Sequence, residues 1–257
     1  MFVDTHCHLY DEKYLDVDAV VKSFVKDGVD IAINMGCSYA SSLKGKELSE
    51  KYNQVYFATG CHPSDVEYFD DREFEQIKQL ANHPKCVAVG EIGLDYHWQP
   101  FDKEKQKICF IKQLEFAKEV NLPISIHSRD ATEDMLKILK ENKALLCNQG
   151  VMHCFSGSKE TARELLDLGL YISFAGPLTF KNAGKLLEVA TFVPSEYCLT
   201  ETDSPYLAPH PLRGTINEPK NVSLVTAFLA QLKGEDLERF AQKIMENTKK
   251  LFKKLQK

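Results

Sequence analysis

Eight short apolar runs, separated by longer segments with helical spacing, constrain the fold of this chain more than any other feature of its sequence. Each run is enriched in Val, Ile, Phe or Tyr and is bounded by Gly, Pro, Asn or charged residues, which is the pattern of a buried parallel strand. The runs are Phe2–His8, Asp30–Gly36, Val55–Gly60, Cys86–Ile92, Pro123–Ser128, Gly150–Phe155, Leu170–Ala175 and Cys198–Glu201. We therefore expect eight parallel strands.

The segments between the runs carry apolar residues at helical intervals. In Asp102–Asn121 we expect the buried stripe to contain Ile108, Ile111, Leu114, Ala117 and Val120, widened by Phe110 and Phe116. Further helices are predicted over Asp71–Ala81, Ala131–Lys140, Ser158–Leu168 and Lys181–Val193, and one or two over 221–257. Ser158, followed by Glu160 and Thr161, has the composition of a helix start.

Eight strands, each followed by a helix, predict a (β/α)8 TIM barrel of class α/β. The 257 residues suffice for one such barrel, and they contain no repeat, low-complexity segment or linker. We therefore expect a single domain over residues 1–257.

The charge balance argues against binding of nucleic acid through a general basic field. The formal net charge is −5, so any nucleic-acid partner has to be captured by a local patch or by a metal ion. The lysines near the end of the chain are one candidate patch, but a solvated helix face is the better interpretation. These lysines are Lys249, Lys250, Lys253, Lys254 and Lys257.

The cysteines and the start of the chain indicate a reducing, cytoplasmic setting. The eight cysteines are scattered without a CxxC pair, which favours reduced, mostly buried thiols. Met1–Asp4 resembles no secretory leader, and no apolar run approaches the ~20 residues that a membrane span needs. We expect no membrane association, and no obligate protein partner is evident.

Ionisable side chains recur where the predicted strands end, which is where TIM barrels carry their chemistry. They are His6, His8, His62, Glu91, His127, His153 and Asp203. A single histidine at a strand end is usually a satisfied core residue, and His6 and His8 alone would suit a surface pair equally well. Glu91, flanked by apolar residues, is more informative, because a buried carboxylate needs a cation or hydrogen-bond partners. Convergence of several such groups on one barrel mouth favours a two-metal centre.

Strand alternation refines this expectation for the first run. Asp4, His6 and His8 share one face of the strand, whereas Cys7 faces the helices and should not bind an ion. We expect Asp4 to hydrogen-bond a ligand or to fill the barrel. We expect Glu201 to orient the loop that carries Asp203.

Four motifs in order give a specific family resemblance. They are Asp4-Thr5-His6-Cys7-His8, Gly90-Glu91-Ile92-Gly93-Leu94-Asp95-Tyr96, His153-Cys154-Phe155-Ser156-Gly157 and Glu201-Thr202-Asp203-Ser204-Pro205-Tyr206-Leu207-Ala208-Pro209. Together they resemble the TatD-type deoxyribonucleases, which belong to the amidohydrolase-like metal-dependent hydrolases. The likeness extends from residue 2 to Asn217-Glu218-Pro219, with a fitting Asn247–Phe252 near the end of the chain.

The resemblance implies a role for each matching residue. His6, His8 and Asp203 would bind a first divalent ion, His127 and His153 a second, and Glu91 would bridge both. His62 and Arg129 would face the substrate phosphate, where an arginine fork suits phosphate oxygens. Arg213 remains as a further substrate contact, although Thr215-Ile216 replaces a basic residue that the family commonly carries there.

The implied activity is hydrolysis of DNA phosphodiesters by a water that two metal ions activate, with Asp203 as proton acceptor, Glu91 as bridge and His62 as phosphate or leaving-group contact. The resemblance favours a 3′–5′ exonuclease on single-stranded DNA or frayed ends. We expect Mg²⁺ or Mn²⁺ in turnover, with Zn²⁺ or another transition ion possible as the bound metal. His97 and Trp98 suit base stacking and loop packing equally well.

Two other functions remain open at this level. A related hydrolase of a small lactone, amide or phosphoester is the nearer alternative, but such enzymes often bridge their metals with a carboxylated lysine rather than a glutamate. A catalytically idle scaffold is the other alternative, and the complete set of candidate ligands argues against it. RNA also remains a possible substrate.

Overall fold

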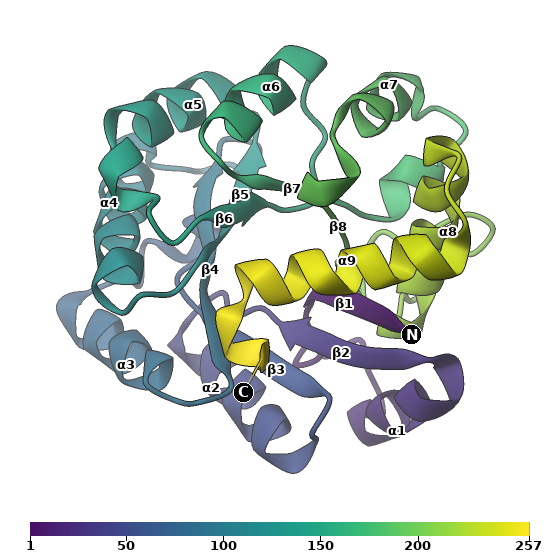
Figure 1. Cartoon of the computed structure of the whole chain (residues 1–257). Helices are drawn as coiled ribbons and strands as arrows, with labels where there is room; N and C mark the ends of the chain where they lie inside the picture. The colour runs from purple at the N-terminus through teal and green to yellow at the C-terminus, as the bar shows by residue number, and fades with distance from the viewer. Residues whose placement is uncertain (257) are drawn as a thin grey trace.

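Eight parallel strands pair in the order in which they occur in the chain (Figure 1). The computed structural model describes residues 1–256. The strands are β1 (Phe2–Cys7), β2 (Val29–Asn34), β3 (Val55–Thr59), β4 (Cys86–Asp95), β5 (Ile124–Arg129), β6 (Gly150–Met152), β7 (Tyr171–Phe174) and β8 (Cys198–Thr200). The ring closes beyond β8, where the His8 N–H donates to the Ser204 carbonyl at 2.7 Å and the Asp203 N–H donates to the His6 carbonyl at 2.9 Å. The predicted (β/α)8 barrel is confirmed.

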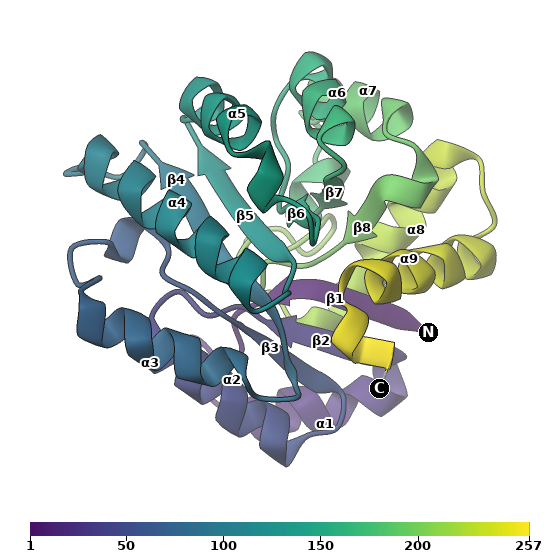
Figure 2. The same cartoon turned by 60° about the vertical axis from the view of Figure 1, so that its left-hand side comes forward.

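The helices surround this sheet, as both views show (Figure 2). They are α1 (Val17–Asp27), α2 (Tyr39–Lys51), α3 (Asp71–Ala81), α4 (Lys103–Glu119), α5 (Thr132–Glu141), α6 (Lys159–Asp167), α7 (Gly184–Phe192), α8 (Val222–Lys233) and α9 (Leu237–Leu251), with short 3-10 turns between them. Side-chain caps begin several of them. The predicted start at Ser158 is confirmed, because its side chain accepts the Thr161 N–H.

α9 crosses the end of the barrel where the strands begin (Figure 1). Buried Asn247 donates to the carbonyls of Ser195 and Cys198 at 2.8 and 3.0 Å and so anchors the start of β8. Lys254 donates to the carbonyls of Ala81 and His83, which ties this lysine to the same end. Lys257 lies outside the described residues.

The buried face of α4 differs from the prediction. Ile108 is 66% exposed, whereas Gln106 and Gln113 are almost fully buried. An interval of three residues drifts around a helix that repeats every 3.6 residues, so the predicted stripe leaves the core. The buried amides have partners: Gln113 pairs with both backbone polar groups of Cys61 (2.7 and 3.1 Å), and Gln106 pairs with both of Asp95 (2.9 and 2.8 Å).

All eight cysteines are free, and Cys7, Cys61, Cys86, Cys109 and Cys198 are buried. Cys7 points away from the barrel axis and packs with Val21 and Phe24 of α1, as strand alternation predicts. Across residues 1–256, no helix has the length and apolar character needed to cross a membrane.

Candidate metal centre

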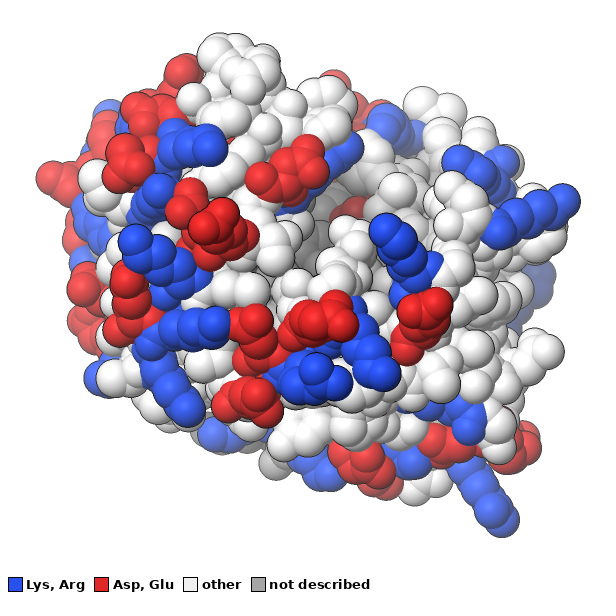
Figure 3. Space-filling model, turned by 90° about the horizontal axis from the view of Figure 1, so that it is seen from above, with Lys and Arg blue, Asp and Glu red and all other residues white. Residues whose placement is uncertain are grey.

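The ionisable residues predicted from the sequence converge at the carboxyl ends of the strands. His6 lies on β1, Glu91 on β4 and His127 on β5, while His153 directly follows β6 and Asp203 lies in the loop after β8. With the exception of the fully buried His6, they line a cavity of about 490 Å³. On the face drawn in Figure 3, acidic and basic side chains are interspersed around a hollow. No single-sign field dominates that face.

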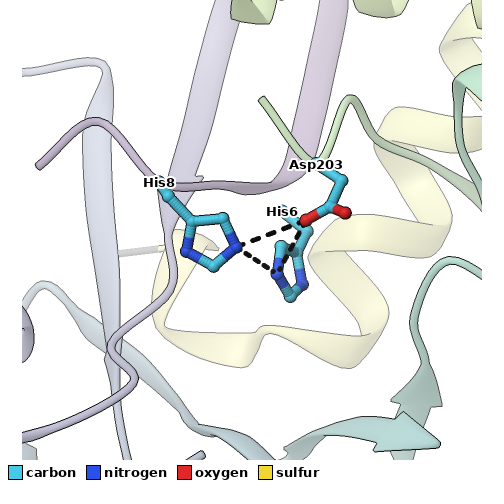
Figure 4. Close-up of side chains that lie close together, drawn as sticks. All are labelled: His6, His8 and Asp203. Carbon is cyan, nitrogen blue, oxygen red and sulfur yellow. Dashed lines mark hydrogen bonds and ion pairs between the residues drawn. The ribbon is translucent and has the colours of Figure 1, made fainter. Parts of the chain in front are cut away.

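The first group of candidate ligands is His6, His8 and Asp203 (Figure 4). The two Nε2 atoms lie 3.2 Å apart, and Asp203 Oδ1 lies 3.7 Å from His6 Nε2 and 3.3 Å from His8 Nε2. Donor atoms bound at about 2.0–2.1 Å to one tetrahedral ion lie about 3.3–3.4 Å from one another. The spacing of these three atoms therefore fits a shared ion.

Glu91 faces this group with one carboxylate oxygen and a second group with the other. Its Oε2 lies 3.3 Å from His6 Nε2 and 3.7 Å from His8 Nε2. Its Oε1 lies 2.9 Å from His127 Nδ1 and 2.8 Å from His153 Nε2, which are themselves 3.2 Å apart. Ligands at right angles around an ion at about 2.0–2.1 Å lie roughly 2.9 Å apart. The second group thus also has spacings that suit a metal ion.

Outer partners fix the histidine rings in these orientations. Asp95 Oδ2 lies 2.9 Å from His127 Nε2, and Tyr10 Oη lies 3.1 Å from His8 Nδ1. Each contact engages the ring nitrogen that faces away from the ligand group, which sets the tautomer. Sequence reasoning missed both roles. For Asp95 a signal existed, because it follows Glu91 by four residues and so shares its face of β4.

Glu201 and Asp4 differ in part from expectation. Glu201 Oε1 lies 3.2 Å from His153 Nδ1 and accepts the Cys154 N–H at 2.8 Å, so it contacts the β6 loop as well as belonging to the loop of Asp203. Asp4 accepts the backbone N–H groups of Thr202 and His6 at 2.9 and 3.3 Å. It therefore holds the backbone of a candidate ligand rather than its ring. Burial raises the pKa of Asp4 to about 8.

The electrostatics of the cluster favour ionised carboxylates. Burial opposes ionisation of Glu91, but electrostatic interactions with the neighbouring histidines, first of all His153, together with the His127 hydrogen bond hold its pKa well below the usual range. Burial likewise opposes ionisation of Asp203, and the hydrogen bond from His8 with the neighbouring histidine charges outweighs it, so that its pKa is also lowered. Such carboxylates are suited to bind cations.

His62 has a different environment from the other histidines. Its Nδ1 accepts the Ser64 N–H at 3.1 Å, so a neutral ring carries its proton on Nε2, which lies 3.7 Å from Glu91 Oε1. Burial lowers the pKa of His62 to about 3. The ring is therefore neutral and presents a hydrogen-bond donor, rather than a lone pair, to the cavity.

The two predicted arginine contacts have separate positions. Arg129 lines the cavity, and its guanidinium lies over the ring of Trp98, 5.1 Å from the centroid. Arg213 stacks on Phe180 at 4.5 Å and is not among the residues that line this cavity. Its contact with substrate stays a prediction. Trp98 also lines the cavity and is 61% exposed.

Comparison with known proteins shows which family the chain belongs to. The family model described as TatD related DNase matches residues 3–253. The chain belongs to the TatD family. Two relatives are the uncharacterized metal-dependent hydrolases YabD of Bacillus subtilis, 44% identical over 98% of this chain and 99% of that protein, and YcfH of Escherichia coli, 41% identical over 97% and 95%.

Solved structures of the TatD family share the whole architecture. The crystal structure of YjjV, a TatD homologue from Escherichia coli, has a TM-score of 0.93 and 33% identity, covering 98% of each chain. A TatD-family hydrolase of Entamoeba histolytica has a TM-score of 0.87 and 25% identity, covering 98% of this chain and 97% of that one. A mutant organophosphorus hydrolase with a TM-score of 0.66 and 16% identity, covering 98% and 92%, shares the fold alone.

Proposed function

We propose that this TatD-family protein is a two-metal-dependent deoxyribonuclease that hydrolyses single-stranded DNA from a 3′ end. The observation that carries the proposal is the position of the Glu91 carboxylate. Its two oxygens face two separate groups of candidate ligands. The family supports the DNA substrate, because its matching model is described as a DNase.

The donor set fits divalent ions. His6, His8 and Asp203 would hold one ion, His127 and His153 the other, and Glu91 both. Two ions bound there would lower the pKa of a water molecule and neutralise charge on the attacked phosphate. Imidazole and carboxylate together favour Zn²⁺ by affinity, whereas Mg²⁺ or Mn²⁺ would serve turnover through availability.

Three side chains of the cavity would act on the substrate directly. Asp203, with its lowered pKa and 16% of its side chain exposed, would accept the proton of the attacking water. His62 would donate from Nε2 to a non-bridging phosphate oxygen. Arg129 would hold a second oxygen with its guanidinium fork, which Trp98 supports from one side.

The preference for a strand end rests on the shape and charge of the mouth. A cavity of about 490 Å³ lies within the roughly 300–1,000 Å³ of small-ligand sites, so it suits a terminal nucleotide and excludes a duplex. Exposed Trp98 and Tyr206 line it and offer aromatic surface for a base. With a net charge of −5, the protein has no general basic field to hold long DNA.

The test is hydrolysis of end-labelled oligonucleotides by the metal-stripped full chain, reloaded with Mg²⁺, Mn²⁺ or Zn²⁺. The substrates are single- and double-stranded DNA with the 3′ or the 5′ end blocked, a matched RNA, and a small lactone. We expect stepwise shortening of single-stranded DNA that a 3′ block and excess chelator abolish. If only a 5′ block prevents shortening, degradation proceeds from the 5′ end and the proposed direction is wrong. If the protein hydrolysed the lactone and left every DNA substrate uncleaved, it would be a small-molecule hydrolase and not a nuclease.

A further inference from the structure

Two buried polar atoms near the centre have no hydrogen-bond partner among the described residues, namely His6 Nδ1 and Glu201 Oε2. Both residues are almost fully buried, His6 at 0% and Glu201 at 1% exposure. Buried side-chain polar atoms nearly always have a partner, supplied by protein or by ordered water. One of these atoms can donate and the other accepts, so each is the kind of partner that the other needs.

The surrounding geometry brings the two residues together. A ring nitrogen of His6, one of His153 and a carboxylate oxygen of Glu201 all lie within 4.8 Å of one another. The His6 and His153 rings stack with centroids 3.9 Å apart and planes inclined by 14°. Both rings direct Nε2 at Glu91, so Nδ1 of each ring is the atom left for a partner beyond the ligand group.

Glu201 already fills that role for His153. Its Oε1 lies 3.2 Å from His153 Nδ1 and is fixed there by the Cys154 N–H. We propose that Glu201 is a positioning residue shared by both metal sites, with Oε1 orienting His153 of the second site and Oε2 orienting His6 of the first through one buried water molecule. A water bridges polar atoms that are too far apart for a direct bond. This inference rests on the two-metal function proposed above.

Sharing has a consequence that an ordinary outer contact lacks. Among the candidate ligands, Asp95 contacts only His127, which belongs to the second group. Loss of Asp95 should therefore weaken the binding of one ion. Glu201 would orient one histidine of each group, His153 directly and His6 through the water molecule, so its loss should weaken the binding of both ions. In Glu201→Gln the side chain keeps its shape but loses the negative charge that strengthens the hydrogen bonds to both rings, and its NH2 group cannot accept a ring proton. Both contacts are therefore weakened.

The experiment is calorimetric titration of the metal-stripped full chain with Zn²⁺. Wild type, Glu201→Gln, Asp95→Asn and the surface control Glu160→Gln are compared. For Glu201→Gln we expect both binding steps to weaken by about 10–100-fold each, the usual effect of an outer partner. Asp95→Asn should weaken one step only, and Glu160→Gln neither. If Glu201→Gln weakens one step or none, Glu201 is not shared.

A second measurement removes dependence on the variant's folding. In the Zn²⁺-loaded wild type with ¹⁵N-labelled histidine, NMR should show exchange-protected Nδ1–H protons on both His6 and His153. A His6 ring that lacks this proton overturns the inference. A wild type that binds fewer than two ions overturns the two-metal function itself, so the two failures are distinguishable.

Discussion

His6 of β1 and His153, which directly follows β6, stack face to face with ring centroids 3.9 Å apart. They belong to different groups of candidate ligands, yet both direct Nε2 at the carboxylate of Glu91. The two groups are therefore parts of one packed unit rather than separate sites. A substitution of Glu91 should consequently affect metal binding at both groups of candidate ligands.

Replacing Glu91 by Gln tests that unit. The amide keeps the shape but removes the charge and one acceptor, so we expect both Zn²⁺ binding steps to weaken by more than the roughly 10–100-fold seen for outer partners. DNA hydrolysis should fall to the level that excess chelator produces. Titration calorimetry and the oligonucleotide assay measure the two effects. Glu75→Gln, an exposed carboxylate on α3 paired with Lys78, is the control. Retention of either ion at full affinity would contradict the bridge.

His62→Ala should separate chemistry from metal binding. Because Nδ1 accepts the Ser64 N–H and Nε2 carries the proton, the ring offers a donor to substrate and no lone pair to an ion. We expect kcat to fall about 100–1,000-fold, as for loss of one donor to a developing oxyanion, with two ions still bound. His62→Gln, which keeps a donor, should recover part of the rate. His83→Ala, in the turn before β4, is the control, and loss of an ion in His62→Ala would make His62 a ligand.

Arg129 and Arg213 should differ in their effect on substrate binding. Arg129 lines the cavity, whereas Arg213 stacks on Phe180 away from that lining. Loss of a charged hydrogen bond costs about 1.5–3 kcal/mol, or roughly 10- to 150-fold, so Arg129→Ala should raise KM for single-stranded DNA by that factor. Arg213→Ala should have a smaller effect. Steady-state kinetics on one oligonucleotide measures KM for both variants. An equal increase in KM would show that Arg213 contacts the substrate as closely as Arg129 does.

Gln113→Leu should destabilise the fold next to the site. The Gln113 amide satisfies both backbone polar groups of Cys61, the residue before His62. Leucine leaves two buried groups unpaired at about 1–3 kcal/mol each, so we expect the free energy of unfolding, measured by urea denaturation, to drop by about 2–6 kcal/mol. Gln79→Leu, exposed on α3, is the matched control. An unchanged urea midpoint in Gln113→Leu would show that these hydrogen bonds contribute nothing.

The arrangement of strands and most of the candidate ligands could be predicted from the sequence. Each of the eight predicted runs overlaps a strand, and α3 has the predicted bounds of Asp71–Ala81. The alternation of side chains along β1 correctly separates His6 from Cys7, which packs against α1. These predictions succeed because periodicity and strand alternation follow from local backbone geometry.

The prediction of the buried face of α4 failed, because the core there contains polar side chains where the pattern predicts apolar ones. The stripe on α4 placed Ile108 inside, yet Gln113 is buried there because the loop after β3 presents a backbone N–H and a carbonyl to it. No apolar periodicity reveals such a pairing, since it depends on groups more than fifty residues away in the chain.

The sequence by itself determined the strand-and-helix order of the barrel and which ionisable residues end its strands, because both follow from patterns within a few residues. Only the tertiary structure decided which oxygen of Glu91 faces which histidines, which nitrogen of His62 carries the proton, and that Glu201 lies beside His153 across 48 positions. Those relations require the ring of strands to close, since closure alone brings β1, β4, β6 and the segment after β8 to one mouth.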